Sequence, residues 1–479
     1  MLKMRPATNS SGLDIQSWSR NRAGLIMMIQ SGRHRSPAES PGGRIKKEER
    51  VMKNFMEKNF MEHEKMENRL FTKDFTLVVI GQIISLFGNA VVRFALPLYL
   101  LNQTGSSALY GTVMACAFIP MIILSPVGGM IADRVNKRNI MVALDFTTAG
   151  LILAFMVLQG KVNLVFLLAL TLMLLYGIAG AYQPAVQASI PALVQQEEFM
   201  RANAVINVVS SFASLLGPVL GGVLYSLYGL LPILEVGLVC FVLSAVMEIF
   251  IRIPFEKQET EGSIWKIMRQ DLRESFHFIR REKPVIGKGL VMVCCVNFFF
   301  SALINIGLPY LVTEVLPFSA SLANRLYGYA QGALAAGGIV GGIGAGILAK
   351  KLQVSKVGNL LLIAALCLFP VGFSLLLTES AMAAYLILAG CCFVIMVVAT
   401  IFSVQIMAFV QTETPQHLVG KVISVCMMLA MCAQPLGNAM YGFLFELCAG
   451  REAVVVLAAG VASLVVAMKA RQVFSLVKG

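Results

Sequence analysis

A row of polar side chains runs along one face of the apolar stretch 76–101. Its members are spaced three, four and four residues apart: Gln82, Ser85, Asn89 and Arg93. This spacing places them on one side of a helix. In apolar surroundings such groups face a protein interior or a water-filled cavity, where they can hydrogen-bond a ligand. The row predicts one wall of a polar cavity, although each uncharged member could equally serve to hold two helices together.

Arg93 and the carboxyl groups carry the charge chemistry. An arginine inside a membrane helix costs at least about 2.5–3.5 kcal/mol on insertion scales. The long aliphatic part of Arg93 can allow its guanidinium to reach the membrane surface. Alternatively, the guanidinium faces the cavity and binds an anion there. We expect the cavity role, with an anionic group of a ligand or Glu235 as partner. Proton coupling requires a carboxyl group that exchanges its proton in the working pH range, and burial can tune this. Glu235 is our candidate for the coupling group. The other carboxyl groups in or near the spans are Asp145, Glu248, Glu314 and Glu446.

The elements that must position these residues follow from composition. The chain of 479 residues is 57% hydrophobic, only 14% charged, and has a mean hydropathy of +0.76. A water-soluble protein needs more polar surface, and an apolar helix needs about 20 residues to cross a bilayer. Because backbone polar groups must pair internally in lipid, we predict an all-α membrane protein rather than a barrel. The twelve expected spans are 76–101, 108–132, 140–159, 163–187, 202–226, 229–251, 287–313, 326–349, 357–377, 382–410, 418–446 and 452–474.

The formal net charge of +13 is a signal of topology and not of nucleic-acid binding. Lys and Arg crowd the N-terminal tail, the loops after even-numbered spans and the C-terminal tail, whereas the opposite loops carry only Lys161, Arg325 and Arg451. The positive-inside rule then places both termini in the cytoplasm. Nine of the ten cysteines lie within expected spans and Cys448 follows span 418–446 by two residues, so we interpret them as small apolar residues and not as disulfides.

Two halves of the chain match each other. At a shift of 217 residues, Leu109-Tyr-Gly falls on Leu326-Tyr-Gly and Pro218 falls on Pro435; at a shift of 212, Leu96-Pro falls on Leu308-Pro. Repeats of this kind indicate two similar bundles. We therefore predict a polar tail at 1–74, a six-helix bundle at 75–251, a cytoplasmic linker at 252–286 and a second six-helix bundle at 287–479. Apolar residues at helical spacing within 264–279 predict an amphipathic helix in the linker.

The loop between the second and third spans reads GGMIADRVNKR at 128–138. It resembles the signature Gly-x-Leu-Ala-Asp-Arg-x-Gly-Arg-Arg of the major facilitator superfamily, whose two six-span halves are parallel repeats. Gly129, Ala132, Asp133 and Arg134 match, Lys137 and Arg138 are basic equivalents, and Asn136 replaces the second glycine. Asn also tolerates left-handed backbone, so this departure is mild. The resemblance covers about 75–475 and implies two pseudo-symmetric six-helix bundles.

Further stretches resemble one branch of this family. Residues 182–194, 201–204 and 216–222 look like the branch that contains macrolide-efflux proteins and the enterobactin exporter. Gly217, Pro218, Gly221 and Gly222 are similar to the signature that the family's exporters carry in span 5, although Ala213 stands where a further glycine is usual. The resemblance implies export.

The resemblance also implies roles for the charged loop and for the polar residues of the spans. The loop cluster would act as a conformational latch on the cytoplasmic side; it comprises Gly129, Asp133, Arg134, Lys137 and Arg138, with Asp145 in its network. The alternative is that these charges only enforce topology. The internal repeat places Asn297, Ser301 and Asn305 of span 7 at the positions that match 85, 89 and 93, and in the family spans 1, 4, 7 and 10 line the central path. Other cavity candidates on the spans are Tyr182, Gln183, Asn203, Asn207, Gln331, Gln405, Gln434 and Asn438.

We thus expect a secondary active transporter of the bacterial inner membrane, a monomer without cofactor. It would be a proton-coupled exporter of amphipathic compounds such as macrolides or siderophores, with protons and membrane lipid as further partners. A lipid or lysophospholipid flippase is the alternative within transport. A membrane enzyme is disfavoured because the four histidines (34, 63, 277 and 417) lie outside the spans, and no Gly-x-x-x-x-Gly-Lys-Ser/Thr motif indicates an ATP-driven pump. A non-transporting sensor would usually carry a soluble output domain, and the tails are too short for one.

The first residues raise a separate question about the translation start. Lys47-Glu-Glu must be encoded AAR-GAR-GAR, where R is a purine, and this can read as a ribosome-binding sequence six nucleotides before Met52. Residues 1–46 also lack the patterning of a folded segment. We therefore expect that the native chain begins at Met52, the alternative being a disordered cytoplasmic tail.

Overall fold

The computed structural model describes residues 70–253, 264–348, 356–416 and 418–475, a few of them by backbone alone. All regular elements in these ranges are helical, and twelve spans are long and apolar enough to cross a membrane. The prediction of a twelve-span helical membrane protein is therefore confirmed. The tail at 1–69, with the expected start at Met52, lies outside the described residues.

Six helices form the N-terminal bundle, joined by short turns. They are α3 (Lys73–Thr104), α4 (Ser107–Arg134), α5 (Lys137–Leu158), α6 (Leu164–Leu193), α7 (Phe199–Tyr228) and α8 (Leu230–Ile249), with a 3₁₀ turn η1 (Gln196–Glu198) before α7. Side-chain oxygens of Thr72, Ser106, Asn136 and Asn163 accept the first free N–H groups of α3, α4, α5 and α6. These caps fix where each helix begins. Span 4 ends six residues beyond the expected boundary, because α6 continues through Pro191.

The C-terminal bundle differs in its first span, which is an α-helix interrupted by π-helical turns. This span consists of α10 (Pro284–Val296), η3 (Asn297–Ser301), α11 (Ala302–Tyr310) and η4 (Leu311–Val315). The remaining spans are α12 (Ala320–Leu348), α13 (Gly358–Leu377), α14 (Ala381–Glu413), α15 (Val419–Leu447) and α16 (Glu452–Ser475). Hydropathy does not reveal π turns, which are rare and occur frequently at functional sites.

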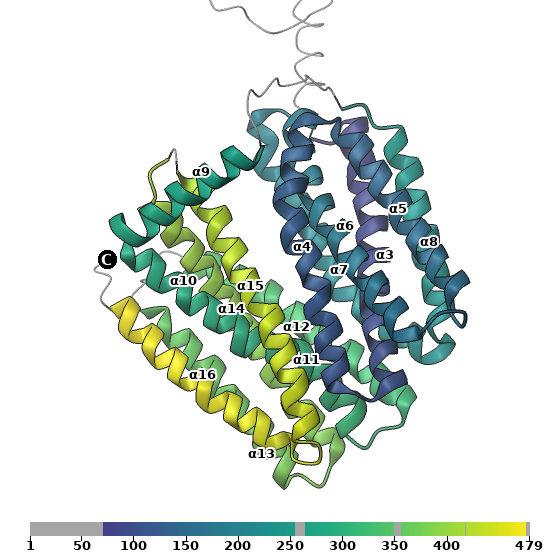
Figure 1. The fold of residues 1–479 in the computed structure, drawn as a ribbon, viewed down its shortest axis with the longest axis vertical. Helices are drawn as coiled ribbons and strands as arrows, with labels where there is room; N and C mark the ends of the chain where they lie inside the picture. Colours follow the sequence, from purple (N-terminus) through teal and green to yellow (C-terminus); the bar gives the residue numbers. More distant parts are fainter. Residues whose placement is uncertain (1–69, 254–263, 349–355, 417, 476–479) are drawn as a thin grey trace, which may run out of the picture. The chain divides into compact units, whose positions relative to one another are not determined.

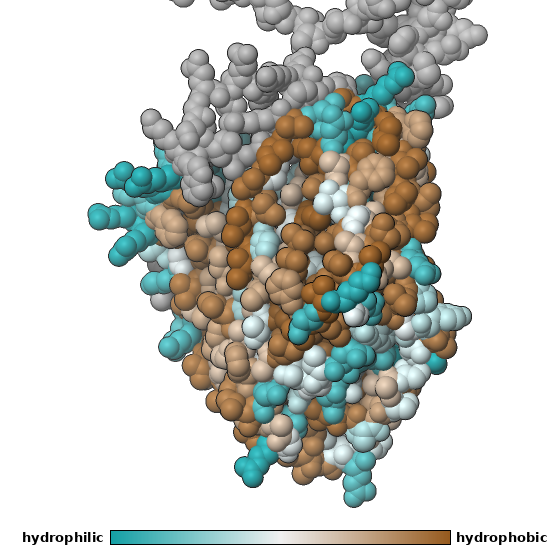
Figure 2. Space-filling model, turned by 45° about the vertical axis from the view of Figure 1, so that its right-hand side comes forward, coloured by the Kyte–Doolittle hydropathy of each residue, from teal (hydrophilic) through white to brown (hydrophobic). Residues whose placement is uncertain are grey.

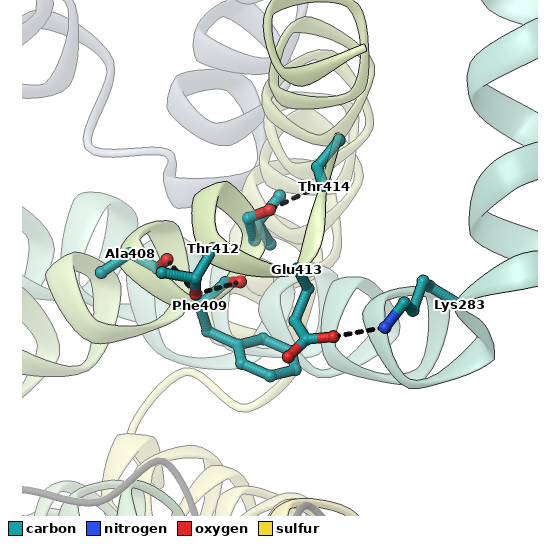
Figure 3. Close-up of polar contacts among 7 residues, drawn as sticks. Lys283, Ala408, Phe409, Thr412, Glu413 and Thr414 are labelled. Atoms are coloured by element: carbon teal, nitrogen blue, oxygen red, sulfur yellow. Dashed lines mark hydrogen bonds and ion pairs between the residues drawn. The ribbon is translucent and has the colours of Figure 1, made fainter. Parts of the chain in front are cut away.

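The linker between the bundles contains the expected helix, α9 (Ile264–His277), continued by a π turn η2 (Phe278–Glu282). Lys421 of α15 pairs with Glu274 of α9 at 2.8 Å, which ties the linker helix to the second bundle. Lys283, at the start of the same bundle, pairs with Glu413 at the end of α14 at 2.6 Å (Figure 3). Both pairs are partly exposed, so each contributes about 0–1 kcal/mol.

The two bundles lie side by side, with α9 at one end (Figure 1). We call this end the linker end and the opposite one the far end. Contacts between the bundles are made chiefly by α4 with α15 and by α7 with α12. At both crossings glycines meet: a Cβ on Gly111 would lie 2.8 Å from the Cα of Gly442, and one on Gly222 would lie 3.0 Å from the Cα of Gly328. These residues allow the backbones to touch because they lack side chains.

Glycine contacts nearer the linker end stay within one bundle. Gly128 of α4 packs on Ala181 of α6, and Gly341 of α12 packs on Val397 of α14. Helices α4 and α12 therefore contact the other bundle at the far end and contact helices of their own bundle nearer the linker end. This arrangement holds the bundles together at the far end.

The outer surface of the bundles suits lipid. Large apolar side chains are exposed along α5 and α8, among them Leu153 and Val157 on α5 and Val239, Leu243 and Val246 on α8. Figure 2 shows hydrophobic residues over most of the upper and middle part of such a face, with hydrophilic residues mainly towards its lower end. Apolar surface on this scale is stable only in a lipid environment.

Candidate functional site

A cavity of about 160 Å³ lies in the C-terminal bundle, near the middle of the span Pro284–Val315. Its polar wall consists of Ser301, Asn305, Gln331 and Gln434. Its apolar wall consists of Val296, Phe300, Ile304, Leu361, Ala364, Ile395, Met396 and Ala399. The structure thus brings together Ser301, Asn305 and Gln434, which the sequence analysis placed at a cavity. An apolar pocket with a few convergent polar groups is the usual form of a small-molecule site.

The amides of this cavity are only partly engaged by the protein. Gln331 Nε2 donates to the hydroxyl of Tyr327 at 3.0 Å, and Asn305 Nδ2 donates to Asn438 Oδ1 at 3.4 Å. Asn438 is fully buried, and its own Nδ2 has no partner. Amide groups with unused hydrogen-bonding capacity at a cavity wall can be satisfied by a ligand.

Arg93 faces the interior of the N-terminal bundle, on the far-end side of the middle of α3. Its guanidinium lies 3.6 Å from the ring centre of Tyr176 on α6, a cation–π contact. Glu235, the alternative partner named above, is exposed on α8. The ion pair between these two residues is therefore not formed in this structure, where an aromatic face takes its place.

A second polar group of residues lies in the N-terminal bundle, towards the linker end. Gln82 Nε2 donates to the hydroxyl of Tyr182 at 2.6 Å, and this hydroxyl donates to Glu248 Oε1 at 2.8 Å. Ser85 Oγ donates to Asp145 Oδ1 at 3.1 Å. We call these five residues, together with Ser244, the acid cluster. It joins α3, α5, α6 and α8.

Three residues that the sequence analysis assigned to the cavity lie in the acid cluster instead. Gln82, Ser85 and Tyr182 are buried here, and none of them lines the cavity described above. Asp145, assigned to the latch network, is also buried here and bonds Ser85. Ser244 donates to the carbonyl of Gly81 at 3.1 Å and so fixes α8 against α3.

The remaining cavity candidates are scattered. Asn89 is half-buried on α3, Gln405 is buried on α14, and Gln183 and Asn207 are exposed. Two others bond their own helix: Asn203 donates to the Phe199 carbonyl and Asn297 donates to the Val293 carbonyl. Polar residues on spans are thus used for helix packing as well as for cavities.

The latch residues Gly129, Asp133 and Arg134 are described by their backbone alone. Their backbone forms the last turns of α4, which ends at Arg134. Asn136 then caps α5 by accepting the N–H of Arg138, whose own Nε donates to Asn139. Asn136, the departure from the family pattern, therefore acts as a helix N-cap. The latch stays a prediction.

The export signature lies where α7 meets two neighbours. Gly217 packs on Ala90 and Gly221 on Phe94, both of α3. The carbonyl of Pro218 lies 2.6 Å from where a Cβ on Gly328 would stand, and Gly222 meets the same turn of α12. The signature thus places α7 between α3 of its own bundle and α12 of the other.

Sequence reasoning named Glu248 among the carboxyl groups considered for coupling but did not anticipate its burial, and it missed Tyr176 as the partner of Arg93. Glu248 stands at the end of an apolar stretch, where hydropathy alone suggests a surface position. A signal was present in its spacing: Gly237, Phe241, Ser244 and Glu248 recur every three or four residues, which is typical of one buried helix face.

The comparisons with known proteins agree with this architecture. Macrolide efflux protein A of Streptococcus pyogenes is 23% identical over 372 residues, which cover 76% of this chain and 87% of that protein. Enterobactin exporter EntS of Citrobacter koseri is 25% identical over 378 residues, covering 77% and 84%. The crystal structure of nucleoside transporter NupG superposes with a TM-score of 0.67 at 14% identity, over 85% of this chain and all of that one. The family model described as Major Facilitator Superfamily matches residues 78–438, and the chain therefore belongs to that superfamily.

Proposed function

We propose that this chain exports amphipathic small molecules across the bacterial inner membrane by alternating access, driven by protons. A secondary transporter is the function of its superfamily, and export is supported by the efflux relatives named above. The direction, the substrate class and the coupling ion belong to the proposal.

The observation that carries the proposal is the cavity of the C-terminal bundle. Its described lining is apolar except for three amides and one hydroxyl, and none of its residues is charged. Such a wall offers apolar contact over most of a ligand and hydrogen bonds at a few points. This combination suits a molecule with an apolar body and hydroxyl or carbonyl groups, as macrolides and other amphipathic compounds have.

Alternating access is supported by the position of the contacts between bundles. Asn102 of α3 donates to Asn324 of α12 at 2.9 Å, and Ser106 before α4 donates to Glu446 of α15 at 3.0 Å. Both bonds lie at the far end, as do the glycine crossings. We infer that this conformation is closed at the far end, and that the latch of the α4–α5 loop closes the linker end in the opposite conformation. The positive-inside rule supports a cytoplasmic position for the linker end.

The experiment uses a pump-deficient bacterium that expresses the full chain, with erythromycin, ethidium and a catechol siderophore as probes. We expect the chain to lower accumulation of at least one probe, and Asn305→Leu and Gln434→Leu to weaken its export. Loss of one hydrogen bond of about 1 kcal/mol corresponds to about a fivefold higher KM.

The matched control is Gln472→Leu, an exposed amide on α16, which should leave export unchanged. Unaltered export by both cavity variants would remove the cavity from the proposal. If the purified chain in vesicles moves a fluorescent lysophospholipid and none of the three probes, the function is that of a lipid flippase.

A further inference from the structure

The acid cluster is buried, and no ion pair to Asp145 or Glu248 is found among the residues that the structure describes. Gln82, Asp145 and Glu248 are 1%, 2% and 0% exposed, so all three are shielded from solvent. The two carboxyl groups are close enough for the charge of one to act on the other. A buried ionised carboxylate is very costly unless it is paired, and two of them together are more costly still.

Hydrogen-bond accounting shows that the cluster lacks donors. The available donors are used: Gln82 Nε2 on Tyr182, Tyr182 on Glu248 Oε1, and Ser85 on Asp145 Oδ1. Three buried oxygens have no hydrogen-bond partner, namely Gln82 Oε1, Asp145 Oδ2 and Glu248 Oε2. All three are acceptors when both carboxyl groups are ionised. Unsatisfied buried acceptors cost free energy, and a proton on each carboxyl group would supply the missing donors.

The described charged groups on the helices around the cluster lie elsewhere. Arg93 sits on Tyr176, eight residues beyond Ser85, or about 12 Å along α3. Lys137 and Arg138 lie at the start of α5, a similar distance from Asp145. The others are Lys73 and Asp74 at the start of α3, Glu235 exposed on α8, and Arg201 of α7, which pairs with Glu198. Arg252 beyond α8 is exposed, and its backbone N–H donates to Asp74.

Apolar residues separate the cluster from the linker end. Val78, one turn before Gln82, forms a buried group with Ile251 and Ile253, which follow Glu248 in the chain. Met141, one turn before Asp145, packs with Ala185 and Val186. The cluster is therefore closed on that side in this conformation, so that its protons would exchange only when α3, α5, α6 and α8 shift.

We propose that Asp145 and Glu248 form the proton-binding site that couples this transporter. A proton on Glu248 Oε2 would be donated to Gln82 Oε1 and close a ring of Gln82, Tyr182 and Glu248 that ties α3 to α6 and α8. A proton on Asp145 removes the second negative charge. Loading forms one O–H bond at a carboxylate oxygen, and release returns that proton to water with no redox change. The inference rests on the proposed function, names its coupling site, and replaces Glu235 by this pair.

The first test measures the protonation of the carboxyl groups in the absence of any substrate. Infrared difference spectra of the purified full chain, recorded while the pH is raised, should contain the C=O band of protonated carboxyl groups, which disappears at high pH. We expect part of this band to be absent in Glu248→Gln and a further part in Asp145→Asn. Glu379→Gln, an exposed carboxyl in the α13–α14 loop, is the control and should retain the whole band. A band that is identical in wild type and both cluster variants would overturn the proposal.

The second test separates this proposal from the proposed function. In vesicles, export of whichever probe the wild type moves should be driven by a pH gradient, and Glu248→Gln should lose that dependence while still exchanging probe between the two sides. Glu235→Gln is the competing variant: loss of the pH dependence there, with its retention in Glu248→Gln, would return the role to Glu235. If sodium and not pH changes the rate, the site binds a metal cation and the proton assignment fails. If no probe is moved, the exporter function fails, while the infrared result still decides the proton site.

Tyr182→Phe tests whether misfolding, and not the loss of a proton site, explains the infrared changes in the cluster variants. This change keeps the ring and removes only the hydroxyl that joins Gln82 to Glu248. We expect the infrared band of Glu248 to shift while the chain remains inserted and monodisperse. An unshifted band would contradict the ring.

Discussion

At the scale of single residues, Arg93 shows how an arginine is accommodated between helices. Its guanidinium rests on the face of Tyr176, so the charge is compensated by a ring and not by a carboxylate. Such a contact is worth about 0.5–2 kcal/mol, depending on solvation. We expect a guanidinium held in this way to attract an anionic group of a substrate, because no carboxylate is paired with it among the described ion pairs.

We expect Arg93→Gln to lower the export of an anionic dye more than that of the cationic dye ethidium, because only the former gains from the positive charge. Arg93→Lys should preserve this selectivity, since the charge remains. The measurement is dye efflux from cells expressing each variant. Arg451→Gln, which removes an exposed cation in the α15–α16 loop, is the matched control. Equal losses for both dyes in Arg93→Gln would indicate that the residue serves packing alone.

Residue types and spacing identified the polar positions but not their partners. Ser301, Asn305 and Gln434 reach the cavity, whereas Gln82 and Ser85 belong to the acid cluster, although both groups show the same helical spacing. Periodicity tells which face of a helix is polar, but it does not tell which neighbour covers that face. Glu248 was named among the carboxyl groups considered for coupling, but its burial beside Ile251 at the end of α8 could not be read from the sequence.

At the scale of elements, glycine determines which helices can cross between the bundles. A Cβ on Gly222 would lie 2.8 Å from the carbonyl oxygen of Asn324 and 3.0 Å from the Cα of Gly328. Backbone atoms cannot move aside as a flexible side chain can. The contact between α7 and α12 therefore depends on the absence of a single methyl group.

We expect Gly222→Ala to weaken the far-end contact and shift the protein towards the conformation that is open there. Distances between spin labels on the far-end loops of the two bundles should be longer in this variant than in wild type. Its transport should also be slower. The control is Gly150→Ala on α5, where an added Cβ meets no atom within 4 Å. Unchanged distances in Gly222→Ala would show that the crossing tolerates the methyl group and does not govern the balance.

Helix positions were predictable to a few residues because the hydrocarbon thickness fixes the length of each span. The π turns of the span Pro284–Val315 and the continuation of α6 past Pro191 were not. Both depend on local hydrogen bonding, which leaves no trace in a hydropathy average.

At the scale of the whole molecule, the glycine crossings and side-chain hydrogen bonds described between the bundles lie at the far end. Bonds such as Asn102 to Asn324 and Ser106 to Glu446 fasten the far end. A transporter needs an alternative set of contacts of similar strength at the linker end, since a state favoured too strongly would halt the cycle. The predicted latch around Asp133 would supply that set.

We expect Asp133→Asn to impair transport while the chain stays folded and inserted, because the latch needs the negative charge. Export by correctly inserted protein is the measurement. Asp74→Asn is the control, since Asp74 accepts the Arg252 N–H and an amide oxygen can do the same. Wild-type export by Asp133→Asn would leave membrane topology as the only role of the loop charges.

The fold as a whole was the most predictable feature. Twelve apolar stretches, the internal repeat and the loop signature all lead to two six-helix bundles, and hydrophobicity and chain length alone determine most of this. The location of the cavity in one bundle and of the acid cluster in the other was not predictable, because each depends on how side chains from several helices converge.

The π turn at Asn297–Ser301 has a genetic consequence. A π turn holds one residue more than an α turn, because its hydrogen bonds join residues i and i+5 instead of i and i+4. Deleting a single codon there would restore an ordinary α-helix and rotate everything beyond it by about 100° relative to α10, given 3.6 residues per turn. Asn305 would then leave the cavity wall without any change in composition. Within this span, one codon therefore decides which residues face the cavity, and two chains with the same polar residues could form different cavities.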